Sequence, residues 1–397
     1  MNTVEHAESI EGAVKGGTGD ATPYAVTIVV HDLGPVGGME LVLTELVLGL
    51  RRLGHPVSVI ARTCDLPADV GVTFHRVRGP ARPFLFAYPW FMLAGSFVLA
   101  RRRRGIVQAT GAIVLGQVDV IAVHYCHQVG PANPSRATPM FRAHASVVAH
   151  LKRIGERLCF RANRAARFVC VSEGVAAEMR AHFPELAERV LTIHNGVDTQ
   201  RFAPGRYREQ ARALRATLGI PQERLVAVLV GSEWERKGLG PLIEALALAR
   251  DWDLVVAGEG DRARYRQLAD SLGVGEAVHW LGVTREVEHV YALADAFVLA
   301  TSYETFSLVS FEAAASGVPI LATAVNGVRE LIDDGHNGFL ITREPQTIAA
   351  RLEQLAADRA MRERLASAAR QAALRFSWEE MVAAHDRLYV SLSQQRV

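Results

Sequence analysis

The stretch VTIVVHDLGPVGGMELVLTELVLGLRRLGHPVSVIA, residues 26–61, contains a complete strand–loop–helix–strand unit. Residues 26–30 and 57–61 are short apolar runs, which are typical of strands buried on both faces. Between them, residues 39–52 follow a helical pattern that ends in two arginines, with Gly54 just beyond, as expected for a helix end. Two strands joined through one helix predict a parallel sheet.

The same alternation of apolar runs and helical stretches continues through both halves of the chain. We therefore predict an α/β fold with two Rossmann-like, doubly wound domains that face each other across a cleft. Helices are expected at residues 239–249 and 262–272. Further strands are expected at residues 106–109, 118–123, 168–171, 225–230, 254–257, 277–281, 296–299 and 319–322.

The division of the chain follows from its turn-rich and apolar segments. Residues 1–22 have no apolar core, so we interpret them as a disordered tail and not as a secretory signal. Ser377 is an expected N-cap, and the helix that it starts is a candidate to return to the first domain. The predicted boundaries are 23–198 for the first domain, 199–220 for a linker, 221–375 for the second domain and 376–397 for the last helix.

The composition limits the class of protein. Of the 397 residues, 49% are hydrophobic and 22% are charged, a balance typical of a soluble α/β protein. The net charge of +2 gives no overall field that would attract nucleic acid. Because the four cysteines include no C-x-x-C pair, we expect reduced thiols in a cytoplasmic protein and no metal site.

Residues 83–100 contain no charged residue and precede the run Arg101-Arg102-Arg103-Arg104. Their length just reaches that of a membrane span, but Pro89 and Gly95 interrupt them and strand-like segments flank them. We favour a buried helix between two parallel strands. The alternative is peripheral membrane contact through residues 84–104, with the arginines against anionic headgroups.

The densest chemical signal runs from Glu304 to Glu312 and precedes Ala-Ser-Gly-Val-Pro at 315–319. Ser307 is an expected N-cap, so the free N–H groups at the helix start can receive a phosphate or sugar hydroxyls. Carboxylates accept hydrogen bonds from sugar hydroxyls, which gives both glutamates a use. Taken singly, each of them is more often an ordinary surface residue.

A second signal is the loop from Gly231 and Ser232 to Arg236 and Lys237, between a strand and a helix. A diphosphate needs positive charge and close backbone approach, and this loop offers both. The Gly-Lys-Ser/Thr ending of a P-loop is missing.

The first domain carries weaker signals. Gly37 and Gly38 stand at a predicted helix start, and His124 and His127 follow a predicted strand. A neutral histidine that donates to a sugar hydroxyl is favoured over a metal ligand, because no third ligand is nearby; a structural histidine is the alternative.

Together these motifs resemble the family 4 glycosyltransferases of the GT-B fold, including bacterial enzymes of lipopolysaccharide and exopolysaccharide synthesis. The likeness covers nearly all of the chain after the tail. It rests on Gly37-Gly38-Met39-Glu40, Val171-Ser172-Glu173, Asn195-Gly196-Val197-Asp198, Arg236-Lys237-Gly238, Gly258-Glu259-Gly260 and Glu304 through Glu312.

The resemblance implies a retaining, metal-independent hexosyltransferase without a cofactor that uses a nucleotide-diphosphate sugar, with a UDP-sugar favoured. It implies that Glu312 binds the ribose, Glu304 contacts the donor sugar, and Arg236 and Lys237 hold the diphosphate. His124 would lie near the reacting sugar. The other implied substrate-binding residues are Gly37, Gly38, His127, Ser172, Asn195, Gly231, Ser232, Phe306, Ser307, Leu308 and Val309.

Two departures leave the donor open: Ser232 stands where many relatives have Arg, and Ser307 where many have Gly. The expected acceptor is a glycan or a lipid-linked glycan of cell-surface polysaccharide or lipopolysaccharide synthesis, handled in the cytoplasm or at the inner face of its membrane. The alternatives are a nucleotide-sugar epimerase and a non-catalytic sugar-binding protein on the same scaffold.

Overall fold

The computed structural model describes residues 23–34, 37–129 and 139–395, so the predicted tail 1–22 lies outside the described residues. The chain divides into two compact units. The first unit comprises residues 1–171, 175–194 and 378–397, and the second comprises residues 172–174 and 195–377.

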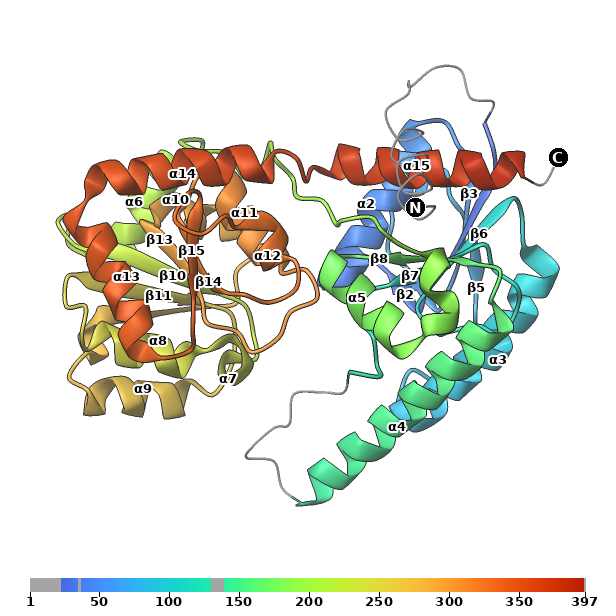
Figure 1. Ribbon diagram of the computed structural model, residues 1–397, viewed down its shortest axis with the longest axis horizontal. Helices are drawn as coiled ribbons and strands as arrows, with labels where there is room; N and C mark the ends of the chain where they lie inside the picture. Colours follow the sequence, from blue (N-terminus) through green and yellow to red (C-terminus); the bar gives the residue numbers. More distant parts are fainter. Residues whose placement is uncertain (1–22, 35–36, 130–138, 396–397) are drawn as a thin grey trace, which may run out of the picture. The chain divides into compact units, whose positions relative to one another are not determined.

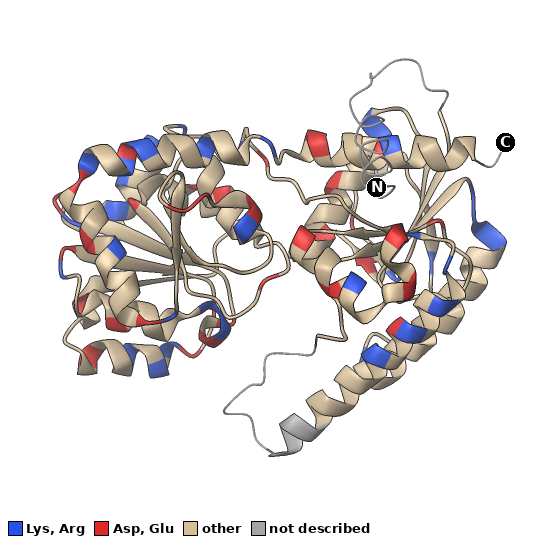
Figure 2. Cartoon of the chain, viewed as in Figure 1, with Lys and Arg blue, Asp and Glu red and all other residues tan. Residues whose placement is uncertain are grey.

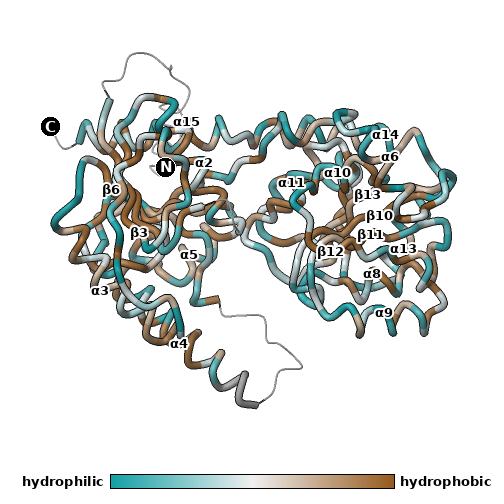
Figure 3. The backbone as a smooth tube through the Cα atoms, turned by 180° about the vertical axis from the view of Figure 1, so that it is seen from behind, coloured by the Kyte–Doolittle hydropathy of each residue, from teal (hydrophilic) through white to brown (hydrophobic). Residues whose placement is uncertain are grey.

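The first unit is built on a parallel sheet with the strand order β5-β3-β1-β6-β7-β8-β9 (Figure 1). Its middle strands are buried apolar runs, which Figure 3 shows as brown segments. The strands are β1 (Val26–Val29), β3 (Val57–Ala61), β5 (Thr73–Arg76), β6 (Ile106–Thr110), β7 (Val120–Val123), β8 (Arg167–Cys170) and β9 (Val190–Thr192), and the short strands β2 (Asp32–Leu33) and β4 (Thr63–Cys64) form a separate pair.

The helices of the first unit cover both faces of this sheet. Helix α2 (Gly38–Arg52) connects β1 to β3 in one direction along the sheet, whereas α3 (Phe84–Arg102) and α4 (Pro139–Ala162) connect β5 to β6 and β7 to β8 in the other. Because such crossovers are right-handed, α3 and α4 lie on one face and α2 on the opposite face. The remaining helical segments are α5 (Glu173–His182), η1 (Ala68–Val70) and η2 (Pro184–Arg189).

The last helix, α15 (Trp378–Gln394), belongs to the first unit and packs beside α2. The contact is close because Gly49 of α2 has no side chain, and a Cβ there would meet the side chain of Val382. Farther along α15, the buried Tyr389 hydroxyl donates a 2.6 Å hydrogen bond to the Gln108 side chain of β6. The helix start at Trp378 places Ser377 just before it, as the sequence predicts.

The second unit has its own parallel sheet, with the order β12-β11-β10-β13-β14-β15. Its core includes the fully buried side chains of Trp252, Phe297 and Phe311. The strands are β10 (Leu225–Val230), β11 (Trp252–Ala257), β12 (Val278–Gly282), β13 (Ala296–Leu299), β14 (Ile320–Thr323) and β15 (Gly338–Ile341). The helices are α6 (Arg208–Thr217), α7 (Trp234–Lys237), α8 (Leu239–Leu246), α9 (Arg262–Ser271), η3 (Gly275–Ala277), α10 (Val287–Leu293), α11 (Leu308–Ala315), α12 (Val328–Leu331), α13 (Pro345–Ala357) and α14 (Arg359–Ala373).

The structure corrects two sequence predictions. Residues 199–220 are more than a linker, because they contain α6, which packs against α10 in the second unit. Helix α3 is not buried all round: Phe91 and Leu99 are buried, but Phe86 and Leu93 are 69% and 65% exposed. A helix that covers one face of a sheet keeps an outward side, and here that side is apolar.

Candidate functional site

The cationic loop follows β10 and owes its shape to glycine. Gly231 has φ 128°, and a Cβ there would stand 2.6 Å from Cε of Lys237. Glu233 begins α7 in the left-handed region at φ 57°, and Gly238 ends it at φ 82°. Glycine accepts the angles at positions 231 and 238 without strain, whereas Glu233 adopts its left-handed conformation at a cost. The segment from Gly231 to Gly238 thereby folds the Lys237 side chain back over the end of β10.

Neighbouring groups hold this loop in place. The Trp234 indole donates a 3.0 Å hydrogen bond to the carbonyl of Gly231. The Arg343 guanidinium donates to the carbonyls of Arg236 and Glu235 at 2.9 and 3.0 Å. The two cations of the loop therefore project from a backbone that is fixed on both sides.

Glu304 forms salt bridges with both cations of the loop. Its Oε1 lies 2.9 Å from Nη1 of Arg236 and 3.0 Å from Nζ of Lys237, and the Thr301 hydroxyl donates to it at 3.3 Å. The side chains of Lys237 and Glu304 are only 9% and 12% exposed. Replacing one member of so buried an ion pair would leave the other charge without a partner, which lowers the stability of the folded state.

The charge of Arg236 is shared between two carboxylates. Burial alone would lower the pKa of Arg236, but Glu304 and Glu233 outweigh burial and raise the pKa of this guanidinium. The Glu233 carboxylate lies 2.8 Å from Nη2 and is 69% exposed, and the carbonyl of Tyr303 accepts from Nη1 at 2.6 Å. An anion that displaces Glu233 would find the guanidinium already oriented.

Helix α11 starts beside this cluster. Ser307 occupies the N-cap position with φ 71° and ψ 63°, and its hydroxyl lies 2.9 Å from that of Ser310 instead of capping a backbone N–H. The first N–H groups of a helix have no carbonyl partner within it, and at this helix start they belong to Leu308 and Val309. With Glu233, Ser307 is one of two non-glycine residues at positive φ in the described part of the chain.

Glu312 lies on α11 itself. The Tyr291 hydroxyl donates a 2.9 Å hydrogen bond to Oε2 of Glu312. Burial raises the pKa of Glu312, although Tyr291, Arg201 and Lys237 partly oppose this. Lys237 therefore acts on both glutamates, through a hydrogen bond to Glu304 and through its charge on Glu312.

Two further predicted residues lie in the second unit. The buried Ser172 hydroxyl donates a 2.7 Å hydrogen bond to the carbonyl of Thr305, so this serine supports the loop before α11. Asn195 is also buried, in the segment where Val197 pairs with Ser377.

The remaining predicted residues belong to the first unit. Gly37 precedes α2 at φ 96°, and Gly38 is the first residue of that helix. His124 and His127 follow β7, and burial lowers the pKa of each imidazole to about 4, helped by the charge of His385 on His124 and of Lys152 on His127. Both rings are therefore neutral near pH 7 and can form hydrogen bonds without carrying charge.

Several residues that shape the site have no signal in the sequence. Tyr291 and Arg343 act through distant contacts that local patterns do not reveal, and Thr301 is one of many threonines. The turn Gly327 could have been found, because a lone glycine after a strand indicates close backbone approach; a Cβ there would meet the backbone of Phe306. Among the described residues, no group of three His, Cys, Asp or Glu side chains is placed to hold a metal ion.

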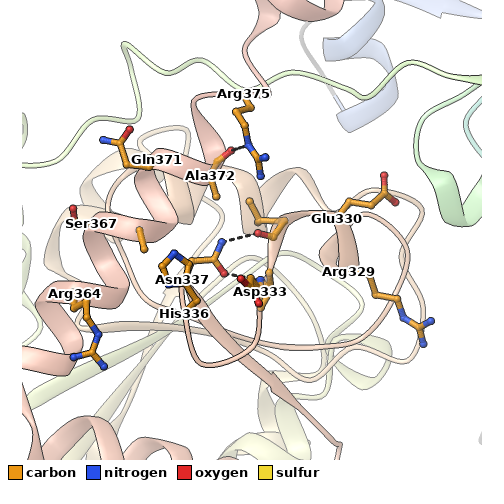
Figure 4. Close-up of a pocket in the computed structure, with 13 residues that line it drawn as sticks. Arg329, Glu330, Asp333, His336, Asn337, Arg364, Ser367, Gln371, Ala372 and Arg375 are labelled. Atoms are coloured by element: carbon orange, nitrogen blue, oxygen red, sulfur yellow. Dashed lines mark hydrogen bonds between the residues drawn. The ribbon is translucent and has the colours of Figure 1, made fainter. Parts of the chain in front are cut away.

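A cavity of about 870 Å³ opens elsewhere in the second unit (Figure 4). It lies between α12 and α14. The side-chain amide of Asn337 lines it, donates to the carbonyl of Leu331 and accepts from the N–H of Asp333, each at 2.8 Å. None of the predicted site residues lines it.

Comparison with known proteins assigns the family. The family model described as Glycosyltransferase Family 4 matches residues 36–201, and that described as Glycosyl transferases group 1 matches residues 210–372. A D-inositol 3-phosphate glycosyltransferase of Geodermatophilus obscurus is 30% identical over 402 residues, which cover 91% of this chain and 86% of the relative. The chain belongs to glycosyltransferase family 4. An uncharacterised glycosyltransferase of Methanocaldococcus jannaschii is 27% identical over 369 residues. The match covers 87% of this glycosyltransferase and 92% of the relative.

Solved structures agree with this family. WaaG, a glycosyltransferase involved in lipopolysaccharide biosynthesis, has a TM-score of 0.73 at 20% identity over 91% of this chain and 98% of its own. Anabaena HepE, solved in complex with UDP-glucose, has a TM-score of 0.70 at 19% identity over 94% of this chain and 100% of its own. These likenesses show the GT-B architecture, so the predicted fold and family are confirmed.

Proposed function

We propose that this glycosyltransferase moves a hexose from a nucleotide-diphosphate sugar to a glycan or lipid-linked acceptor with retention of configuration, and that it needs no metal. The cluster of Glu304 with Arg236 and Lys237 beside the start of α11 carries this proposal. Two oriented cations and a helix N-terminus are the groups that a departing diphosphate requires.

In the proposed reaction, the bond between the anomeric carbon and the diphosphate oxygen breaks, and the nucleoside diphosphate leaves with the electron pair. The acceptor hydroxyl attacks from the same face, and its proton passes to the leaving phosphate oxygen. Lys237 and Arg236 stabilise the charge that develops on the diphosphate, together with the N–H groups of Leu308 and Val309. Glu304 orients both cations and accepts from the donor sugar hydroxyls.

Other predicted groups bind the nucleotide and the reacting sugar. Glu312 accepts hydrogen bonds from the ribose hydroxyls and is held for this by Tyr291. His124 donates from its neutral ring to the reacting sugar. Uridine is the proposed base, which the UDP-glucose complex of the HepE structure supports.

The proposed setting is cell-surface polysaccharide or lipopolysaccharide synthesis at the inner face of the cytoplasmic membrane. The likeness to WaaG supports it, and so does the exposed apolar side of α3. The epimerase and the non-catalytic binding protein are not favoured, because Arg236, Lys237 and Glu304 are all present and lie together, as the proposed transfer requires.

A second acceptor class is a small polyol that carries a phosphate, as in the name of the Geodermatophilus relative. Lys152 favours it: its Nζ lies 5.0 Å from the centre of the Phe84 ring, and burial lowers its pKa. The same charge lowers the pKa of His31 and His127, so it lies near both rings. No described carboxylate forms a salt bridge with Lys152.

The test is a screen of UDP-, GDP- and ADP-sugars by thermal shift, followed by acceptor-dependent release of the nucleoside diphosphate. We expect stabilisation by a UDP-sugar and a product whose anomeric proton coupling in NMR matches that of the donor. An inverted linkage would overturn the retaining mechanism, and binding without release on any glycan or phosphopolyol would favour a non-catalytic protein. A KM increase for the phosphopolyol in Lys152→Ala would select the second acceptor class.

A further inference from the structure

The outward side of α3 is an apolar stripe. Phe86, Trp90, Leu93 and Phe97 are 69%, 51%, 65% and 58% exposed. Their spacing of four, three and four residues places them on one side of the helix. By length and composition α3 could cross a membrane, yet its opposite side packs Phe91 and Leu99 into the first unit, so it is fixed as a surface helix.

Helix α4 extends this stripe. Val147, Ile154 and Leu158 are 54%, 43% and 52% exposed, and their spacing of seven and four residues again defines one side of a helix. Helices α3 and α4 lie side by side on the same face of the sheet (Figure 1). Their buried sides meet where the Tyr88 hydroxyl lies against Gly155. Their apolar sides therefore both point away from the sheet. We call these seven residues the apolar surface.

Arginines border the apolar surface at one end. In right-handed crossovers α3 and α4 both run opposite to the strands, so their carboxyl ends lie at the same edge of the sheet. Arg101 to Arg104 stand at the end of α3 (Figure 2), and the Arg101 guanidinium lies 3.5 Å from the centre of the Phe97 ring. At the end of α4, a small cavity of about 200 Å³ is lined by Arg157, Arg161, Arg164 and His182, with Glu185 as its carboxylate.

These arginines are available to an anion. Within the described ranges, Arg103 lies 3.9 Å from Asp119, but Arg101, Arg157, Arg161 and Arg164 form no salt bridge. A soluble surface rarely leaves large apolar side chains contiguous, and arginines beside such a patch match the phosphates that border an acyl layer.

We propose that the apolar surface inserts into the headgroup layer of an anionic lipid bilayer, with the arginines of α3 and α4 on the lipid phosphates. The occupant is a lipid surface because apolar area and unpaired cations adjoin on the same two helices. The proposal rests on, and gives a physical basis for, the membrane setting of the proposed function. It can fail without affecting the proposed sugar transfer, because the cluster around Glu304 lies in the other unit.

The test is co-sedimentation of the full chain with vesicles of phosphatidylcholine containing about one third phosphatidylglycerol. The apolar variant replaces Phe86, Trp90, Leu93 and Phe97 with Ser, and the charge variant replaces Arg157, Arg161 and Arg164 with Gln. We expect the apolar variant to bind at least tenfold more weakly to any vesicle. We expect the charge variant to bind anionic vesicles about 10²-fold more weakly and pure phosphatidylcholine as the wild type does.

The control replaces Leu248 and Val283, two exposed apolar residues of the second unit, with Ser, and should bind as the wild type does. A measurement of insertion depth does not depend on whether the apolar variant folds. Brominated lipid should quench the tryptophan fluorescence of the wild type more than that of Trp90→Phe. Wild-type protein that stays in the supernatant overturns the proposal, and so does equal binding by the apolar variant. A wild-type dimer that the apolar variant dissociates, without lipid binding, would assign this surface to a second copy instead.

Discussion

The two units share a doubly wound fold but handle charge in opposite ways. The second unit buries ionised groups and pairs them, as Glu304 does with Arg236 and Lys237. Four imidazoles of the first unit are kept neutral instead, because burial lowers the pKa of His31, His124, His127 and His385 to about 4 each, whereas the buried His55 pairs with Asp386 at 2.8 Å. Paired charges suit the charged diphosphate of the proposed donor, whereas neutral rings suit hydrogen bonds to sugar hydroxyls, so one fold can present two kinds of polar surface through its loops.

The largest expected effect comes from removing one of the paired charges of the second unit. Lys237→Ala removes one of the two cations proposed to stabilise the leaving diphosphate, and we expect kcat/KM to fall by about 10²- to 10³-fold, the usual loss for one such group. The control is Arg359→Ala, whose ion pair with Glu363 is exposed in the same unit. A fall of less than tenfold in initial-rate measurements would remove Lys237 from the diphosphate site.

Glu304→Gln separates orientation from charge. The glutamine amide keeps the shape of the side chain but no longer neutralises Arg236 and Lys237, so these cations attract a diphosphate more strongly. The donor sugar, however, loses the carboxylate that is proposed to accept its hydrogen bonds. We expect the transfer rate to fall by about 10²-fold. The affinity for free UDP should stay equal or rise, as measured by calorimetry, and parallel losses of both would contradict the assignment.

Acid should distinguish the two units. The buried histidines have a folded pKa of about 4 against an ordinary 6.5, so their neutral forms stabilise the first unit above pH 6.5. That stability is lost as the pH falls from 6.5 towards 4, by about 3 kcal/mol for the buried His385 alone. Hydrogen exchange should show β1, β7 and α15 losing protection in this range before β10 and β13, and simultaneous loss would refute the contrast.

Glu312→Gln should move binding and stability in opposite directions. Because burial raises the pKa of Glu312, its proton stabilises the folded state at low pH, and that contribution is lost as the pH rises through the raised value. The variant should therefore gain stability relative to wild type between pH 4 and 7. Nucleotide affinity should fall about tenfold through loss of charged hydrogen bonds to the ribose. Denaturant melts at several pH values and calorimetry check both parts.

The smallest expected effect concerns backbone strain in the second unit. Ser307 has φ 71°, which glycine accepts without cost, so Ser307→Gly should change stability by no more than about 1 kcal/mol and towards stabilisation. Ser316→Gly, at the ordinary helical φ of −75°, is the control and should destabilise. A loss in Ser307→Gly equal to that of the control would show that the Ser310 contact matters more than the angle.

The sequence indicated most of the strands and singled out the residues that the structure brings together around Glu304, for identifiable reasons. Buried parallel strands are continuous apolar runs, so β10 and β3 were predicted with their observed bounds. The edge strand β5 reads Thr-Phe-His-Arg and is largely exposed, so no apolar run marks it. Arg236, Lys237 and Glu304 stood out because each adjoins a strand end or a helix start.

What the sequence could not supply were contacts between distant segments. Nothing near Glu312 indicates Tyr291, and nothing near Arg236 indicates Arg343. The sequence also leaves open whether α3 is buried or exposed, because a uniformly apolar helix has no periodicity that separates its buried side from its outward side.

The most direct test of the donor site is the ratio of the affinities for UDP and uridine, measured by calorimetry in wild type and Lys237→Ala. If Arg236 and Lys237 hold the diphosphate, wild type should prefer UDP by about 10²-fold or more, and the variant should lose at least tenfold of that preference while binding uridine unchanged. An unchanged ratio would contradict the account, because the diphosphate would then be held by groups other than the cluster around Glu304.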